Sequence, residues 1–395
     1  MMKNVGIIVF ICTLVFVALS SPPQTHTPDT EAVVATTTPT ETATTTTVAE
    51  IPFTEEIVVP LADIIQEPAP LKTKSPEKPL IHTPLTRPEP APTAQETVTS
   101  STGTPVTRLQ NPYSFPKLSS ESINVSARAG LVNILCTNPS NGQSTSGSGV
   151  VIDRRGVVLT NAHIAQFVLL AEVSNSISCT IRTGSPATSQ FEAQILFLPN
   201  KWVAKHAKDL RVAKPTGTGE DDYALVLAVP IAQGTPLPSP IPFDTREGVI
   251  FERDPVLLAS YPAGFLGNFF AQNDLYPAST FTTIKKLYTF GEASIDLLSL
   301  GGVIIAQGGS SGGAVVNEWG RLVGIIVTSS DAATTEARDL RSVTVAHINR
   351  SLREHTGQDL TEYLSGDILE HGNIFRVNDL PALAKELVDA LPHTE

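Results

Sequence analysis

The chain has 395 residues, 31 of them proline, and a formal net charge of −12 at pH 7. Nucleic-acid binding needs a basic surface, so this composition excludes that class of function, and it gives no reason to expect charge-driven attachment to an anionic bilayer. The 3 cysteines and 8 histidines form no cluster with metal-ligand spacing, so no metal site is expected.

The first segment is apolar. Lys3 precedes an apolar run from Val5 to Leu19. A run of about fifteen apolar residues fits the hydrophobic region of a signal peptide and is short for a membrane-spanning helix of about twenty. We therefore expect residues 1–20 to be a signal peptide or an N-terminal membrane anchor. Either one exports the rest of the chain, and membrane contact is expected only through this segment.

The next segment, residues 21–110, is rich in threonine and proline. It holds about half of the prolines and a single glycine, Gly103. Threonine and proline together make up roughly 40% of it, far above average usage. Such a composition cannot bury enough apolar surface to offset the entropy lost on ordering. We expect a disordered linker.

The pattern changes within residues 111–365, which we expect to form one folded domain. Short β-rich runs alternate with turn residues, which is typical of an all-β barrel or sandwich. Helical spacing of apolar residues indicates two helices, at 202–210 and 345–356. Residues 366–395 are expected to be a C-terminal tail with one short helix at 380–391. The predicted strands are 130–136, 146–153, 157–160, 177–182, 193–198, 223–229, 255–259, 287–290, 302–306, 314–317 and 322–328.

A serine pair between glycines, in the string QGGSSGGA that begins at Gln307, is the most distinctive motif. Glycine before a nucleophilic serine lets a backbone N–H face a developing oxyanion, and glycine after it lets the backbone pack closely. The same string is also typical of a Gly/Ser hairpin loop. A serine nucleophile needs a base, and the base needs an orienting acid.

Two upstream positions could supply these partners. His163 follows the predicted strand 157–160, and Asp221 and Asp222 precede the strand 223–229. A lone histidine is more often structural, and an acid before a strand often lies in a solvated turn. Adjacent side chains of a strand point to opposite faces, so only one of the two acids can face His163.

Together these strings resemble the trypsin-like serine proteases. The order is His, Asp, Ser, and the strings GSGVVID, LTNAHI, DYALV and GSSGGAVVN are most similar to the protease domain of the bacterial HtrA/Deg type. About forty residues follow the helix at 345–356, too few for a PDZ domain. The resemblance implies a chymotrypsin-like double antiparallel β-barrel with a C-terminal helix and the active site between the barrels.

The resemblance also implies roles for individual residues. Ser311 would be the nucleophile, His163 the general base, and Asp222 the acid that orients the imidazole. Asp222 is preferred over Asp221 because it directly precedes the hydrophobic-Ala-Leu string. The N–H groups of Gly309 and Ser311 would form the oxyanion hole. Ile305, six residues before the nucleophile, would lie at the base of the primary specificity pocket.

The function that follows is an exported serine endopeptidase acting on a protein or peptide substrate without a cofactor. An apolar pocket base gives no counter-charge for Arg or Lys, so cleavage is expected after small or medium apolar residues. Two alternatives stay open. One is a catalytically inactive, protease-like binding module. The other is an α/β-hydrolase, because GSSGG fits the G-x-S-x-G motif, although that fold requires the order Ser, acid, His on alternating strands and helices.

Cys136 and Cys179 lie in the predicted strands on either side of the His163 segment. Two cysteines in an exported domain can form a disulfide, which would tie together the walls around His163. The alternative is two separate buried thiols. We expect the disulfide.

Overall fold

The computed structural model describes residues 106–140, 142–211, 217–264, 268–291, 293–329 and 339–391. The expected signal peptide or anchor, and the linker up to residue 105, lie outside these ranges. Within them, no helix is both long enough and apolar enough to cross a membrane.

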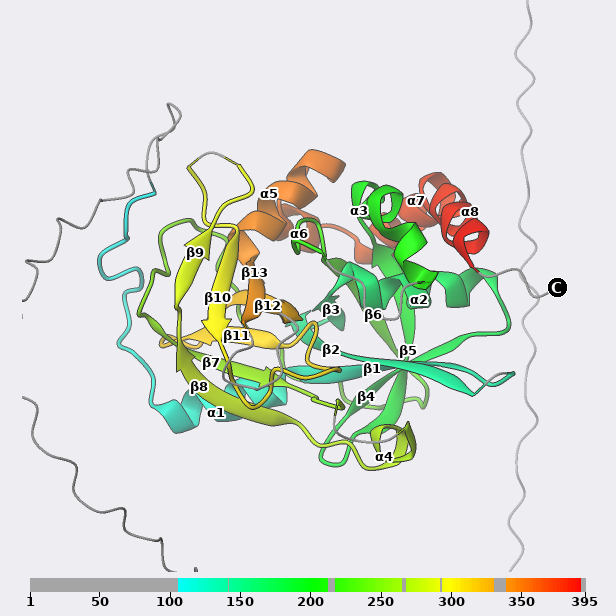
Figure 1. Cartoon of the computed structure of the whole chain (residues 1–395), viewed down its shortest axis with the longest axis horizontal. Coiled ribbons are helices and arrows are strands. Elements are labelled where there is room, and N and C mark those ends of the chain that lie inside the picture. The colour runs from blue at the N-terminus through cyan, green and yellow to red at the C-terminus, as the bar shows by residue number, and fades with distance from the viewer. Residues whose placement is uncertain are drawn as a thin grey trace, which may run out of the picture. The chain divides into compact units, whose positions relative to one another are not determined.

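The first half of the domain is a closed antiparallel barrel with the strand order β1-β2-β3-β6-β5-β4 (Figure 1). Its interior is filled by apolar side chains. In short strands such as β3, and in most of β6, every residue is buried. The strands are β1 (Leu131–Asn138), β2 (Gln143–Asp153), β3 (Val157–Thr160), β4 (Ser178–Thr183), β5 (Thr188–Phe197) and β6 (Ala224–Pro230).

The second half is a seven-stranded antiparallel sheet that curves into a half-barrel, with the order β8-β7-β11-β12-β13-β10-β9. It has its own apolar core, formed by residues such as Leu258, Leu298 and Ile326. The strands are β7 (Pro255–Ser260), β8 (Ala278–Thr283), β9 (Lys286–Tyr288), β10 (Leu297–Gly301), β11 (Ala314–Asn317), β12 (Leu322–Ser329) and β13 (Leu340–Thr344).

These two sheets confirm the predicted chymotrypsin-like fold. They also exclude the α/β-hydrolase alternative, because that fold is built from alternating strands and helices. At the level of single strands, residues 157–160 and 314–317 are strands as predicted, whereas the predicted strand at 302–306 is wrong. The chain there forms turns after β10, and β10, β8 and β13 were not predicted.

Helices cover one side of the first barrel, and the last two are part of its packing (Figure 1). The sequence predicts a C-terminal tail at residues 366–395, whereas in the structure α7 packs on β5 and α8 packs on α2 and α3. Leu383 and Leu387 of α8 are buried in the same core as the barrel strands. The helices are α1 (Ser120–Ala129), α2 (Ala162–Val173), α3 (Asn200–His206), α4 (Asn268–Asn273), α5 (Val345–Thr356), α6 (Leu360–Ser365), α7 (Ile368–Asn378) and α8 (Leu380–Ala390), with a 3-10 turn at Ala207–Arg211.

The expected disulfide between Cys136 and Cys179 is present. The two residues face each other across the neighbouring strands β1 and β4, with an S–S distance of 2.03 Å and Cα atoms 4.0 Å apart. The bridge therefore joins one edge of the β1 hairpin to the strand that follows α2.

Candidate active site

His163 and Asp222 form a doubly hydrogen-bonded pair at the open end of the first barrel. The Asp222 carboxylate accepts the His163 backbone N–H on Oδ1 (3.0 Å) and contacts His163 Nδ1 through Oδ2 (2.8 Å). Asn161 strengthens the link because its side-chain amide donates to the Asp222 carbonyl oxygen (2.8 Å). His163 is the second residue of α2, directly after β3, so a strand end and a helix start together fix its backbone.

The neighbouring acid, Asp221, points elsewhere. It has a left-handed backbone, with φ of 55°, and its carboxylate accepts a hydrogen bond from Ser351 Oγ in α5. Ser351 in turn accepts one from the Tyr223 hydroxyl (3.0 Å). The two consecutive acids thus serve different partners, and the one that contacts His163 is Asp222.

Charge and burial act in opposite directions on His163. Its burial lowers the pKa of the imidazole, but the charge of Asp222 and the hydrogen bond to it outweigh burial, so the pKa is raised above its ordinary value. The side chain of Asp222 is 8% exposed and that of His163 29%. The imidazole is therefore held by a shielded carboxylate while part of it stays open to the surface.

The serine pair is divided between a structural and an accessible position. Ser310 is buried, with 1% exposure, and its hydroxyl bonds to the Ile305 carbonyl and the Ser260 hydroxyl in the second core. Ser311 is partly exposed and lines a cavity together with His163 and Asp222. Of the two serines, Ser311 is the one that lines the cavity with His163.

That cavity has a volume of about 250 Å³ and lies between the two sheets. One part of its wall comes from the segment between β5 and β6, which the sequence did not connect with the site. There His206 Nδ1 contacts Asp209 Oδ2 (2.7 Å), and the His206 ring stacks on Trp202. The lining residues are His163, Gln166, Trp202, His206, Asp209, Gly217, Gly219, Glu220, Asp222, Gln307, Gly308, Ser311 and Val327.

The turn that carries Ser311 is held from both sides by backbone contacts. The Gly308 carbonyl accepts a hydrogen bond from Ala263 N (2.7 Å), which turns the N–H of Gly309, on the other side of that peptide plane, away from Ala263. Ser148 Oγ donates to the Gly309 carbonyl (2.7 Å), and Ser148 N donates to the Ser311 carbonyl (2.7 Å). Within the described part of the chain, the N–H groups of Gly309 and Ser311 donate to no protein atom.

Glycine is required at the position after Ser311. Gly312 has φ of 83°, and a Cβ there would lie 2.0 Å from the Ser148 carbonyl oxygen. This close approach is where β2 of the first barrel meets the turn of the second sheet that carries Ser311. A side chain at position 312 would push the two barrels apart at the site.

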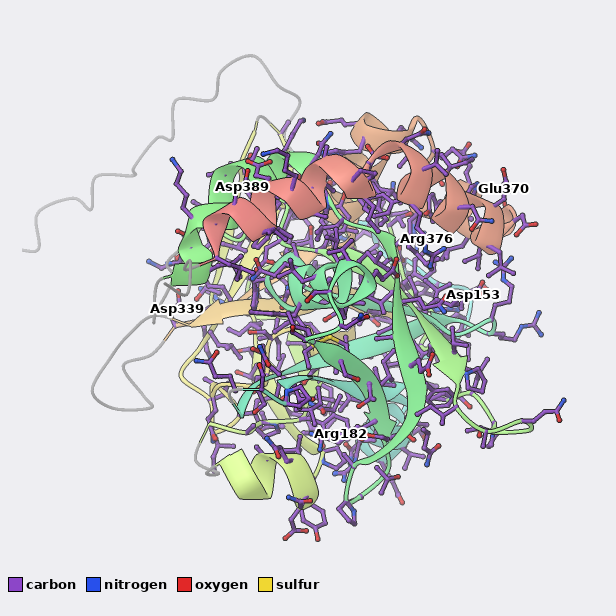
Figure 2. The ribbon with its side chains drawn as sticks, turned by 90° about the vertical axis from the view of Figure 1, so that its right-hand side faces the viewer. Asp153, Arg182, Asp339, Glu370, Arg376 and Asp389 are labelled. Atoms are coloured by element: carbon purple, nitrogen blue, oxygen red, sulfur yellow. A yellow bond between two sulfur atoms is a disulfide. The ribbon has the colours of Figure 1, made fainter. Side chains whose placement is uncertain are left out.

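Arg182 is a buried cation that no motif in the sequence indicates. Its side chain is 1% exposed, and its guanidinium donates to Asn133 Oδ1 (2.8 Å) and to the carbonyls of Gln272 (2.6 Å) and Ala271 (2.8 Å) in α4. Figure 2 shows Arg182 in the first barrel, on the side of α4. Burial lowers the pKa of Arg182. These contacts join the first barrel to α4, which follows Ala263 in the chain. Ala263 N in turn donates a hydrogen bond to the Gly308 carbonyl.

Ile305 does not lie beside the other predicted site residues. Its side chain is 2% exposed and packs in the core of the second sheet, and it does not line the cavity that holds His163 and Ser311. Its neighbour Ile304 is 72% exposed. Ile305 contacts the turn of Ser310 and Ser311 through its backbone, because its carbonyl accepts a hydrogen bond from the Ser310 hydroxyl.

A family model matches the part of the chain that carries these residues. No curated protein matches the chain. Residues 147–325 match the family model of the trypsin-like peptidase domain. This range begins in β2 and ends in β12, after the turn that carries Ser311. The chain therefore carries a trypsin-like peptidase domain over residues 147–325.

Proposed function

We propose that this protein is an exported serine endopeptidase whose catalytic triad is Ser311, His163 and Asp222. The observation that carries the proposal is the double hydrogen bond of Asp222 to His163, made in the same cavity that Ser311 lines. A carboxylate that accepts a hydrogen bond from Nδ1–H keeps the ring proton on Nδ1 and leaves the lone pair of Nε2 free to act as a base.

In the first step, Ser311 Oγ attacks the carbonyl carbon of the scissile peptide bond and transfers its proton to His163 Nε2. Asp222 stabilises the imidazolium that forms. The tetrahedral intermediate collapses when His163 gives this proton to the leaving amine, which produces an acyl-enzyme on Ser311. Water then attacks the ester with His163 again as the base, and the acid product leaves.

The oxyanion of the intermediate binds the N–H groups of Gly309 and Ser311. Two observations support this role. Neither N–H donates to a protein atom within the described residues, and the Gly308–Gly309 peptide is fixed by the bond from Ala263 N. Donors that are already fixed before the reaction stabilise the transition state without a reorganisation cost.

We propose that cleavage follows small or medium apolar residues. Trp202 and Val327 give the cavity wall apolar side chains. The two carboxylates of the cavity wall outside the triad already have partners. Asp209 contacts His206 (2.7 Å), and Glu220 contacts Lys205 (3.4 Å). A substrate Arg or Lys would therefore find no unpaired acid there. Peptide-library profiling that gave a clear preference for Arg or Lys would refute this specificity.

Export through residues 1–20, with a linker at 21–110 ahead of the protease domain, completes the proposal. The similarity to the HtrA/Deg type rests on the strings around His163 and Ser311. Fusion of residues 1–20 to a reporter that is active only outside the cytoplasm tests export, and a reporter that stays inactive would contradict it.

The catalytic assignment is tested by covalent labelling with a fluorophosphonate, followed by mass spectrometry of the labelled peptide. We expect the label on Ser311, loss of labelling in His163→Ala, and loss of nearly all hydrolysis in Ser311→Ala. Removing a triad member in such enzymes costs on the order of a millionfold in turnover. Ser310→Ala is the matched control, because it deletes the adjacent, buried hydroxyl. Labelling of Ser310, or substantial hydrolysis by Ser311→Ala, would refute the triad.

A further inference from the structure

A second cavity, of about 370 Å³, lies between the end of β5 and the helices α5, α6 and α7. It shares no lining residue with the cavity of the proposed triad. Its volume is in the range of pockets that hold small molecules, about 300–1,000 Å³. Neither the trypsin-like peptidase domain nor the proposed reaction assigns it a role.

Aromatic side chains form much of its wall. Phe197, Tyr363 and Phe375 are nearly fully buried, with exposures of 6%, 4% and 4%. The rings of Phe197 and Phe375 lie 6.1 Å apart, and the Tyr363 ring lies 4.3 Å from that of His371. Clustered ring faces favour an apolar group, and they also attract an organic cation through their quadrupoles.

Two imidazole nitrogens in this wall, His355 Nε2 and His371 Nδ1, are buried and have no hydrogen-bond partner among the described residues. The tautomer of His355 follows from Nδ1, which lies 2.7 Å from the Ser351 carbonyl oxygen. Since a carbonyl oxygen only accepts, Nδ1 must carry the proton and donate. In the neutral ring, Nε2 is therefore a hydrogen-bond acceptor with no donor. A buried acceptor without a donor is costly, so a ligand N–H placed there would be stabilised.

The one acidic residue in the lining is Asp379, which precedes α8. Its carboxylate caps no backbone N–H of that helix, and it has no basic partner within the described part of the chain. The nearby cation of α7, Arg376, is paired with Glu172 (3.1 Å). The cavity thus combines one unpaired negative charge, two imidazole nitrogens and three aromatic rings.

We propose that this cavity binds an organic ammonium ion attached to an aromatic or branched apolar group. The ammonium would donate to Asp379 and to His355 Nε2, and the apolar group would pack on Phe197 and Phe375. The same chemistry occurs in free arylalkylamines and in the N-terminus of a peptide that begins with an aromatic residue. The site does not depend on the proposed triad, so each can fail without the other.

The test is isothermal titration calorimetry of the full chain with 2-phenylethylamine. Its matched probes are 2-phenylethanol, which keeps the ring but lacks the charge, and phenylacetate, which reverses the charge. We expect the amine to bind at least about tenfold more tightly than the alcohol, because a charge-assisted hydrogen bond is lost in the alcohol. A phenylalanine-initiated dipeptide amide, compared with its N-acetyl form, distinguishes a peptide N-terminus from a free amine as the source.

Variants locate the site. Asp379→Asn should weaken amine binding about tenfold or more, as expected for the loss of one charged hydrogen bond. Asp389→Asn is the matched control, because it makes the same change on the same helix, at an exposed residue at the far end of α8 (Figure 2). His355→Phe keeps an aromatic ring and removes the acceptor, so it tests the site if Asp379→Asn does not fold.

Three results would overturn the proposal. The first is equal affinity for the amine and the alcohol. The second is an equal effect of Asp379→Asn and Asp389→Asn. The third is no binding of the amine at about 10 mM, which corresponds to a binding free energy too small for a built site.

Discussion

Replacing Asp222 by asparagine should remove catalysis by forcing the wrong tautomer of His163. Asp222 Oδ1 accepts the backbone N–H of His163 (3.0 Å), and Oδ2 faces Nδ1 (2.8 Å). An asparagine must keep its carbonyl oxygen toward the backbone N–H, so its NH₂ group is turned toward Nδ1. Nδ1 then has to accept, the ring proton moves to Nε2, and Nε2 can no longer take the proton of Ser311.

The expected loss in turnover is about 10⁴-fold, the size found when this acid is changed to an amide in enzymes with such a triad. At 1.36 kcal/mol per factor of ten, this corresponds to about 5.4 kcal/mol in activation free energy. The measurement is kcat and KM on a fluorogenic peptide, with the fold checked by circular dichroism. The matched control is Asp221→Asn, which keeps a carbonyl acceptor for Ser351 and suits the left-handed backbone at this position. It should lose less than about tenfold, since the one hydrogen bond that is altered, that of Ser351, does not involve His163 or Ser311.

The pH dependence gives an independent check. Only neutral His163 is a base, and Asp222 raises the pKa of this imidazole. Activity of the native protein should therefore fall as the pH drops through a value above the ordinary histidine pKa of about 6.5. In Asp222→Asn both raising influences are gone and burial still lowers the pKa, so the residual activity should persist to lower pH. Near-native turnover in Asp222→Asn, a 10⁴-fold loss in Asp221→Asn, or an unshifted acid limb would refute this reasoning.

Three further predictions concern stability. Replacing both Cys136 and Cys179 by serine should cost about 4 kcal/mol in the chain-entropy description, for a sequence separation of 43 residues, and a loss below about 1 kcal/mol in urea unfolding would contradict it. Burial raises the pKa of Asp296, but hydrogen bonds, that of His347 first, outweigh this and lower it to about 2. Its ionised form therefore stabilises the fold by about 2 kcal/mol at pH values above the unfolded pKa of about 4, and this contribution is lost as the pH falls toward 2. In Asp296→Asn, the Tm should therefore change less with pH in the acid range than in the native protein. Gly312→Ala should lower the free energy of unfolding by about 3 kcal/mol or more and abolish fluorophosphonate labelling, because its Cβ would lie 2.0 Å from a carbonyl oxygen of β2; an active, stable variant would refute the close approach.

The sequence by itself determined the all-β class and the residues that meet at the site. Strands with turn residues at both ends, such as Val157–Thr160 and Ala314–Asn317, are local patterns, and local patterns can be read from a sequence. The order of His163, Asp222 and Ser311 was also readable, because each lies in a string typical of trypsin-like proteases.

The sequence analysis missed or mispredicted elements whose secondary structure depends on tertiary packing. The helix Ala162–Val173, which carries His163, is apolar on nearly all sides, so it has no amphipathic period to detect. The apolar run at residues 302–306 looks like a strand, but the chain pairs with β13 through Leu297–Gly301 instead. Apolar runs of this length fit several structures, and only long-range pairing selects one.

The tertiary structure shows which of two chemically alike neighbours makes each contact, a choice that the sequence supported only through its resemblance to trypsin-like proteases. Asp221 and Asp222 are both acids, and Ser310 and Ser311 are both serines flanked by glycine. Asp222 contacts His163 while Asp221 contacts α5, and Ser310 is buried in the second core while Ser311 lines the cavity. Composition and spacing carry no information on which of two identical side chains faces a partner about sixty or more residues away, because that direction is fixed by how the two barrels pack against each other.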